Sequence, residues 1–159
     1  MDSEIRIRRL GRDDAALYRT IRLEALEREP DTFFATYESE ASKPMSFFAK
    51  RLAASVVFGA FDGAGIVGMA GFYRPQGRGT LWGMYVRKSA RRSGAGRALV
   101  HAVIAYAAKR TDALQLIVSA GNSGAVRFYK ALGFAEAGSA PDSAMRHGDE
   151  IVMRMELSR

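Results

Sequence analysis

The sequence predicts a single α/β domain over residues 1–159, of the α+β kind, with a mixed, mostly antiparallel central sheet of about seven strands and helices on both faces. At 159 residues and 48% hydrophobic content, the chain can bury one substantial core. Strand-like and helix-like runs follow in the order β, α, α, β, β, β, α, β, α, β, β, which fits neither a doubly wound nor an all-β fold. No internal repeat or flexible linker divides the chain.

The first half of the chain predicts a strand, two helices and a meander of three strands. SEIRIRR (residues 3–9) alternates with period two, and Asp13 or Asp14 then caps an amphipathic helix that stops at Pro30. The aromatic-rich connection that follows contains a short helix over residues 46–52. ASVVFGAF and IVGMAGFY form a hairpin around the turn DGAG, and TLWGMYVR adds a third strand.

The second half predicts two more helices and three more strands. ARRSGAGRALV (residues 90–100) leads into a helix over about residues 96–109, and ALQLIVSA is the next strand. Asn122 can cap the following helix, and Gly133 stands where that helix should end. FAEAGSA and EIVMRMEL supply two closing strands.

Composition excludes several kinds of site and of cellular location. The chain has no cysteine, and His101 and His147 lie far apart without ligand-like spacing, so we expect no metal site. The N-terminus lacks a hydrophobic signal core, and no apolar run approaches the roughly 20 residues that span a bilayer. We expect a cytoplasmic protein without a membrane partner.

The positive charge of the chain is concentrated in one segment. The net charge is +7, yet no acidic residue occurs between Asp62 and Asp112. The basic residues of this segment are Arg74, Arg78, Arg87, Lys88, Arg91, Arg92, Arg97, Lys109 and Arg110. Such a segment attracts a polyanion, either a nucleic acid or a small ligand with several phosphates. Nucleic-acid binding would also need a reading helix or stacking aromatics on a basic sheet, so we expect no nucleic-acid partner.

Two glycine patterns compete as phosphate sites. GAGIVG (residues 63–68) matches G-x-G-x-x-G, but a strand follows it where a dinucleotide fold requires a helix, so these glycines are predicted to form a turn and a strand. ARRSGAGRALV has Leu99 and Val100 where a nucleoside-triphosphate loop needs glycine and lysine. It does have a strand before it and a helix after it, which is the arrangement of an anion site.

A helix N-terminus binds anions because its first amides lack partners inside the helix and its dipole is positive there. Gly94 and Gly96 let the backbone approach a phosphate closely. Arg91, Arg92 and Arg97 add charge around the same turn. The predicted ligand therefore carries a pyrophosphate and a further phosphate, and coenzyme A fits this description.

Two motifs carry a resemblance to a known family. RRSGAG (residues 91–96), preceded by the strand LWGMYVR, resembles the Q/R-x-x-G-x-G/A pyrophosphate motif of the GCN5-related N-acetyltransferases (GNAT). NSGAVRFYKALGF (residues 122–134) is similar to the family's asparagine-initiated helix that ends in a glycine-aromatic pair. The two motifs stand in the right order with the right strands and helices around them, which makes the resemblance far more specific than either motif alone.

The resemblance implies an acetyl-CoA-dependent transfer of an acetyl group to a primary amine of a small molecule, amino acid or peptide. The residues that it places along coenzyme A are Met84, Tyr85, Val86, Arg91, Arg92, Ser93, Gly94, Ala95, Gly96, Arg97 and Asn122. It places Tyr129 beside the coenzyme sulfur, which makes Tyr129 the catalytic candidate. The departing thiolate has a conjugate acid of pKa about 8.5, and a phenol of pKa about 10 is a plausible proton donor to it. The alternative is that Tyr129 is an aromatic core residue beside Phe128.

The acceptor side is less defined. Relatives that acetylate peptide α-amines often carry a glutamate five residues before the asparagine, where this chain has Ile117. Glu38 or Glu40 could remove the proton from the amine, or water and backbone carbonyls could relay it, and either carboxylate could equally be a surface residue. The candidates for the acceptor pocket are Phe33, Phe34, Tyr37, Glu38, Tyr73 and Trp82, which could also be core residues.

Acceptor specificity is expected in residues 31–49 and 138–148. Two functions remain open at this point: the N-acetyltransferase, and a non-catalytic acyl-CoA-binding or regulatory module on the same fold. The resemblance is compatible with a monomer or a homodimer.

Overall fold

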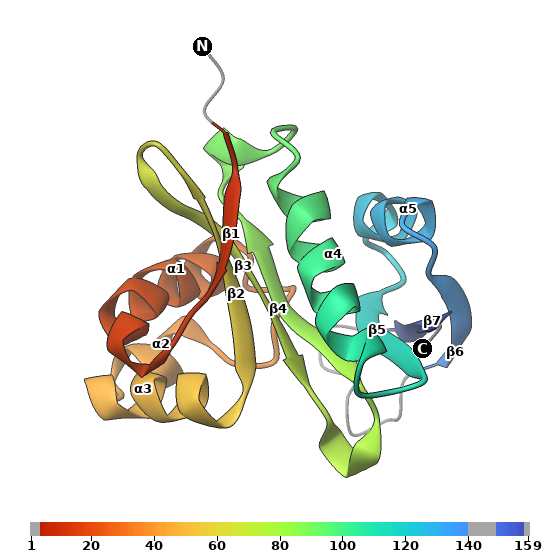
Figure 1. Cartoon of the computed structure of the whole chain (residues 1–159), viewed down its shortest axis with the longest axis horizontal. Helices are drawn as coiled ribbons and strands as arrows, with labels where there is room; N and C mark the ends of the chain where they lie inside the picture. Colours follow the sequence, from red (N-terminus) through yellow and green to blue (C-terminus); the bar gives the residue numbers. More distant parts are fainter. Residues whose placement is uncertain (1–3, 140–148, 158–159) are drawn as a thin grey trace.

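The computed structural model describes residues 4–139 and 149–157 and shows an open, mixed sheet of seven strands (Figure 1). The strands are β1 (Arg6–Arg9), β2 (Val56–Asp62), β3 (Gly65–Tyr73), β4 (Thr80–Val86), β5 (Ala113–Ser119), β6 (Ala135–Ser139) and β7 (Glu150–Glu156). Their order across the sheet is β1-β2-β3-β4-β5-β7-β6, and only β4 and β5 are parallel. The predicted fold class is confirmed.

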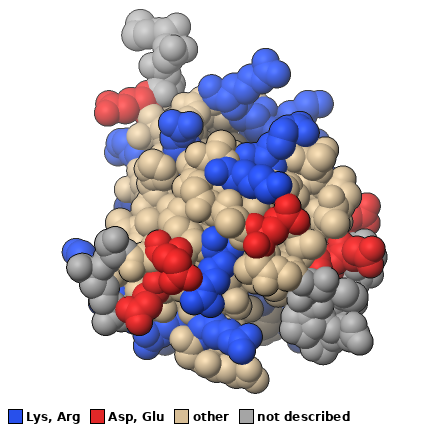
Figure 2. Space-filling model, turned by 90° about the vertical axis from the view of Figure 1, so that its right-hand side faces the viewer, with Lys and Arg blue, Asp and Glu red and all other residues tan. Residues whose placement is uncertain are grey.

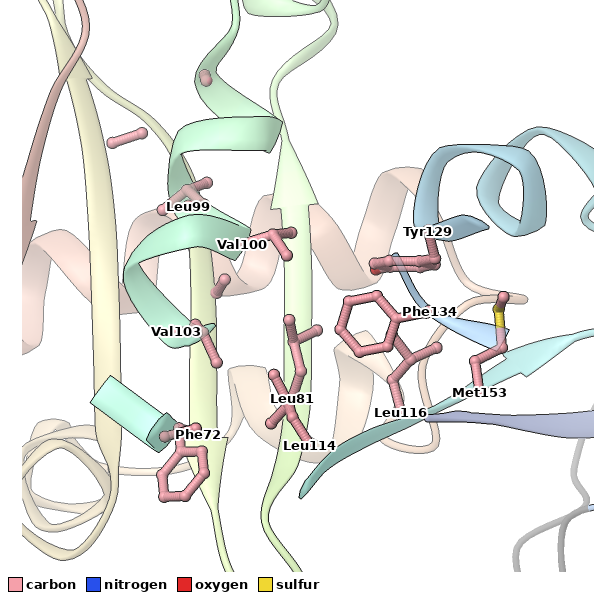
Figure 3. Packing of buried hydrophobic residues seen from close by; sticks show 14 of the residues in the cluster. Phe72, Leu81, Leu99, Val100, Val103, Leu114, Leu116, Tyr129, Phe134 and Met153 are labelled. Atoms are coloured by element: carbon pink, nitrogen blue, oxygen red, sulfur yellow. The ribbon is translucent and has the colours of Figure 1, made fainter. Parts of the chain in front are cut away.

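Helices cover both faces of the sheet. The helices are α1 (Ala15–Arg28), α2 (Tyr37–Ala41), α3 (Met45–Ala54), α4 (Ala95–Ala108) and α5 (Ser123–Ala131). Helices α1 and α3 lie against one face of β2 and β3, and α4 lies against the other (Figure 1). Two buried clusters result, one on each side of the sheet. The cluster beneath α4 extends under α5, where Tyr129 and Phe134 meet Leu116 and Met153 (Figure 3).

The local signals for the helix ends are mostly confirmed. The Asn122 side chain accepts a hydrogen bond of 3.2 Å from the Ala125 amide, and Gly133 takes a φ of +107° just after α5. Asp14 precedes α1 as predicted, but its carboxylate accepts instead from the Gly11 amide and from Arg8, which together lower its pKa. The five-residue helix α2 was not predicted, because it is too short to show a helical period.

The residues GAGIVG form the turn and the start of the second strand of the β2–β3 hairpin. The Asp62 carboxylate accepts from the Ala64 amide in the turn, and Gly65 takes a φ of +125°. Residues 65–73 continue as strand β3. These glycines therefore belong to a turn and a strand, as predicted, and no helix follows them.

Strand β4 contains a bulge that decides which way its side chains point. Ala70 on β3 stands opposite both Gly83 and Met84, and Gly83 takes a φ of +64°. The extra residue breaks the alternation of the strand. As a result Trp82 and Tyr85 both pack toward α1, while Met84 packs toward α4.

The sheet opens between its two central strands. Only Thr80 and Gln115 pair between β4 and β5, and the strands then diverge (Figure 1). Strand β4 remains paired with β3 on its other side, and β5 remains paired with β7. We call the unpaired gap between β4 and β5, beyond this single pair, the seam.

Candidate active site

The turn between β4 and α4 is shaped to hold an anion. Arg92 and Gly94 take φ values of +72° and +90°, so left-handed residues alternate along this turn as they do in anion-binding nests of backbone amides. Gly94 is the N-cap of α4, and the Gly96 and Arg97 amides fall in the first turn, where the helix offers them no carbonyl. We call residues 91–97 the cradle.

Side chains hold the cradle in shape. The Ser93 hydroxyl donates to the Ala90 carbonyl and accepts from the Ala95 amide at 3.2 Å. Arg91 donates to the Val86 carbonyl at 3.1 Å and forms an ion pair of 2.7 Å with Glu29. The cradle is therefore tied both to β4 and to the end of α1.

A cavity of about 680 Å³ opens beside the cradle. Of the residues predicted to bind the coenzyme, those lining it are Met84, Tyr85, Val86, Arg91, Arg92, Gly94, Gly96, Arg97 and Asn122. Ser93 and Ala95 do not line it. Basic side chains gather over the upper part of the face shown in Figure 2, the end of the molecule at which α4 begins in Figure 1.

Tyr85 faces mainly away from this cavity because of the β4 bulge. Its side chain is buried against α1, and its hydroxyl donates to the Glu24 carboxylate at 2.8 Å. Burial and this carboxylate raise the pKa of Tyr85 to about 12. Arg87 binds the same carboxylate at 2.9 Å.

A second cavity of about 690 Å³, which we call the chamber, lies beside the first. Its wall comes from the loop after α1, from β4, from β5 and the turn after it, from α5 and from the start of β7. Its carboxylates are those of Glu29, Asp31 and Glu150, and none of the described residues that line it is lysine or arginine. The described lining of the chamber is thus acidic where the cradle is basic.

The chamber and the cradle cavity meet at the seam. The residues that line both are Glu29, Thr32, Met84, Asn122, Ala125 and Tyr129. The Tyr129 ring projects from α5 toward β4, with its oxygen at the leading end (Figure 3). A ligand held at the cradle and another held in the chamber would therefore meet beside Tyr129.

Tyr129 combines the two roles that the sequence left as alternatives. Its side chain is buried, and its ring packs edge-on against Phe128 and Phe134 at centroid distances of 5.2 and 5.8 Å. Burial raises the pKa of Tyr129 above its usual value, so the phenol, already protonated at neutral pH, becomes a weaker acid. Tyr129 is thus a core residue that also lines the junction of the two cavities.

The predicted acceptor residues are divided between the chamber and its surroundings. Phe33, Phe34 and Trp82 line the chamber. Tyr37 and Glu38 are exposed on α2 and do not line it. Tyr73 packs edge-on against Trp82 at 5.7 Å and lines a separate shallow hollow.

Glu40 lies in a buried ion-pair network beside the chamber and lines neither cavity. Its carboxylate accepts from Arg22 at 3.0 and 3.1 Å and from Arg51 at 3.0 and 3.2 Å. Burial opposes ionisation, but the two arginines outweigh it and lower the pKa of Glu40. Glu40 is a structural counter-ion and is not placed to take a proton from an acceptor.

The same network supports the wall of the chamber. The Arg22 guanidinium lies 5.2 Å from the centre of the Phe33 ring and 5.7 Å from that of Trp82. A Cβ on Gly83 would lie 3.9 Å from Arg22 Nη1, so the bulge passes directly over this guanidinium. Glu40 therefore acts on the chamber indirectly, through Arg22.

Among the chamber residues that the sequence did not identify, Glu150 is the most buried carboxylate. It begins β7, pairs in register with Ser119 on β5, and is 7% exposed. Its position follows from the register of β7 against β5, and no motif in the sequence marks it. The proposed specificity segment 138–148 lies outside the described residues except for Gly138 and Ser139 of β6.

The described residues hold neither a cluster of metal ligands nor a helix that could span a membrane. No three His, Asp or Glu side chains in the described chain are grouped as metal ligands. None of the described helices is both long and apolar enough to cross a membrane.

The open sheet, splayed between its central strands, is the fold of the GNAT acetyltransferases. A model of the acetyltransferase (GNAT) family matches residues 17–134, and the chain belongs to this family. The match includes the cradle, the seam and Tyr129. A search of curated protein sequences finds no match.

Solved structures similar to this chain are acetyltransferases at low sequence identity. An N-acetyltransferase from Staphylococcus aureus Mu50 is 19% identical, with a TM-score of 0.77 over 97% of this chain and 98% of the other. The yncA protein of Salmonella typhimurium, solved with its cofactor acetyl-CoA, is 18% identical, with a TM-score of 0.75 over 99% and 96%. The ribosomal-protein-S18-alanine N-acetyltransferase of Escherichia coli is 23% identical, with a TM-score of 0.70 over 98% and 96%.

Proposed function

We propose that the protein is an N-acetyltransferase that uses acetyl-CoA to acetylate a primary amine of a small molecule, an amino acid or a peptide. The observation that carries this proposal is the junction of two oppositely charged cavities at Tyr129. Family membership supports acetyl-CoA as the donor, and yncA, a structure similar in fold, was solved with it. The similar fold of the ribosomal-protein-S18-alanine N-acetyltransferase supports including peptide amines among the acceptors.

The residues of the cradle fit the charged end of coenzyme A. Free amides at the start of α4 and the exposed Arg92 and Arg97 side chains would bind the pyrophosphate and the further phosphate. The coenzyme's arm would then run along Met84 and Val86 into the seam, where the edge of β4 is not paired with β5. As a substrate, acetyl-CoA supplies an activated acetyl thioester.

Residues at the junction of the two cavities would contact both the attacking amine and the departing sulfur. The amine would enter from the chamber and attack the thioester carbon. The reacting atoms would then lie beside Met84 and Tyr129, which line both cavities. The Tyr129 phenol is protonated at neutral pH, so its hydroxyl can donate a hydrogen bond toward the sulfur as negative charge develops there. Asn122 shapes this region by capping α5 with its side-chain oxygen.

The proposal is tested by separating binding from turnover. Acetyl-CoA affinity is measured by calorimetric titration, and thiol release is followed with a panel of amines that includes spermidine, free amino acids and short peptides. Binding together with amine-dependent thiol release and an acetylated product supports the enzyme. Binding without release by any amine would identify the non-catalytic module instead.

A further inference from the structure

We propose that Glu150 binds the acceptor ammonium in the chamber and removes its proton before attack, a role that rests on the proposed N-acetyltransferase function. An amine is cationic at neutral pH and cannot attack until it loses a proton. Neither carboxylate proposed from the sequence, Glu38 or Glu40, lines the chamber. The chamber itself contains the carboxylate that the reaction needs.

The register of the sheet directs Glu150 toward the acceptor side. Leu116 and Val118 are buried in the cluster beneath α4 and α5, so Ile117 and Ser119 project from the opposite face of β5. Residues paired directly across an antiparallel ladder share a face, which puts Glu150 on the same face as Ser119. Ile117, Ser119 and Glu150 all line the chamber, and Leu116 and Val118 also reach it from the other face at the open edge of β5.

The backbone around Glu150 is fixed on both sides. The Ala120 amide donates to the Asp149 carbonyl at 3.0 Å, just before β7 begins. The Asn122 amide donates to the Ser119 carbonyl at 3.0 Å, which ties the start of α5 to the end of β5. Glu150 is thus held by the strand pairing next to the turn that carries Asn122, one of the residues at the junction of the two cavities.

Burial distinguishes Glu150 from the other two carboxylates of the chamber. Glu29 is only half-buried, and Asp31 is exposed to solvent. Glu150 is 7% exposed, and electrostatic attraction to a cation is stronger where water is excluded. An incoming ammonium would therefore be drawn past the two outer carboxylates to the inner one.

The transfer conserves protons and electron pairs. The ammonium gives one proton to the Glu150 carboxylate, and the freed nitrogen lone pair forms a C–N bond with the thioester carbon. The C–S bond breaks with its electron pair on sulfur, and the thiolate takes up a proton from Tyr129 or from water. The amide nitrogen loses its second proton to solvent, Glu150 returns its proton to solvent, and Tyr129, where it supplied the thiol proton, regains one from solvent.

A matched pair of small nucleophiles tests the assignment. Methylamine is cationic at pH 7, whereas methoxyamine of similar size is neutral and needs no base. In Glu150→Gln we expect thiol release with methylamine to fall about 100-fold or more and release with methoxyamine to fall less than about threefold. Acetyl-CoA affinity, measured by titration, should not change, since the cradle is untouched.

Two other variants complete the experiment. Glu156→Gln changes an exposed carboxylate of the same strand that binds Arg154 and lines neither cavity, so its rates should match the wild type. Glu150→Asp keeps a carboxylate, so it should still release thiol with methylamine, at a reduced rate. This variant keeps the assignment testable if the Gln variant fails to fold. Equal losses with both nucleophiles, or no loss, would overturn the role of Glu150. Acetyl-CoA binding without release from wild-type protein would instead overturn the proposed function.

Discussion

The cradle and the chamber are built in opposite ways. The cradle is one run of seven residues, 91–97, whose backbone conformation makes the site and whose charge is positive. The chamber is assembled from distant segments whose side chains make the site and whose lining charges are negative. A backbone site depends on local geometry, whereas a side-chain site depends on how the strands pair. The two should therefore respond to different mutations.

The largest expected effect is on the cradle. Gly96→Glu places a carboxylate where the ligand's phosphates would lie, and we expect acetyl-CoA affinity to fall more than about 1,000-fold, or about 4 kcal/mol. The matched Gly96→Ala adds only a Cβ, which would contact Met84 and Phe128 at an ordinary 3.4 Å, so its loss should be far smaller. Calorimetric titration measures both. Unchanged affinity in the Glu variant would remove the cradle from the coenzyme site.

The next effect is on the support of the chamber. Glu40→Gln leaves Arg22 and Arg51 without their buried counter-ion, and we expect the free energy of unfolding at pH 7 to fall by about 3 kcal/mol. Because the folded-state pKa of Glu40 is lowered, its contribution is complete above the ordinary value of 4.5 and is lost as the pH falls through the lower folded-state pKa. Urea denaturation of both proteins should therefore show a difference that shrinks with acidification. A difference independent of pH would contradict the ion-pair explanation.

Tyr129→Phe probes the junction where the two sites meet. Loss of the hydroxyl should lower kcat about 30-fold, or about 2 kcal/mol, with little change in acetyl-CoA affinity, because the ring and its packing remain. Tyr106→Phe is the matched control, since Tyr106 lies on α4 and lines neither cavity. Wild-type turnover in the Tyr129 variant would leave that residue with only its packing role.

The smallest effect is that of salt. We expect acetyl-CoA affinity to weaken about fivefold between about 0.05 and 0.5 M ionic strength, since the arginines of the cradle are exposed and their attraction is screened. Pantetheine, which lacks the phosphates, should bind with little salt dependence. Equal salt dependence of the two ligands would mean that the cradle charges do not contact the phosphates.

The contrast between the two sites also explains what could be predicted from the sequence. Gly94 and Gly96 stand close together in the sequence, and the turn that Gly94 permits is a local property, so the cradle could be predicted. The order of strand-like and helix-like runs is also visible in the sequence, so the fold class could be predicted. Glu150 becomes a chamber residue only when β7 pairs with β5 in one register, and Glu40 becomes buried only when α2 folds against Arg22 and Arg51. A one-residue change of register would turn Glu150 to the other face of the sheet.

The β4 bulge was not predicted, for a similar reason. The run TLWGMYV is apolar and β-prone enough to predict a strand, but it does not fix that Gly83 and Met84 stand together opposite Ala70. Without the bulge, Trp82 and Met84 would share a face and the wall of the chamber would differ. A glycine within a strand can signal a bulge, and Gly83 is the one residue of β4 that carried such a signal.

The seam between β4 and β5 makes amide hydrogen exchange a direct reporter of occupancy. The edges of both strands that face the seam are paired only at Thr80 and Gln115, so the backbone amides beyond that pair that point into the seam should exchange quickly in the free protein. A ligand arm with its own amide groups could complete this pairing. Binding would then both slow amide exchange along β4 and β5 and raise the melting temperature of the protein. The hydrogen bonding of the sheet would be complete only when the acetyl donor is bound.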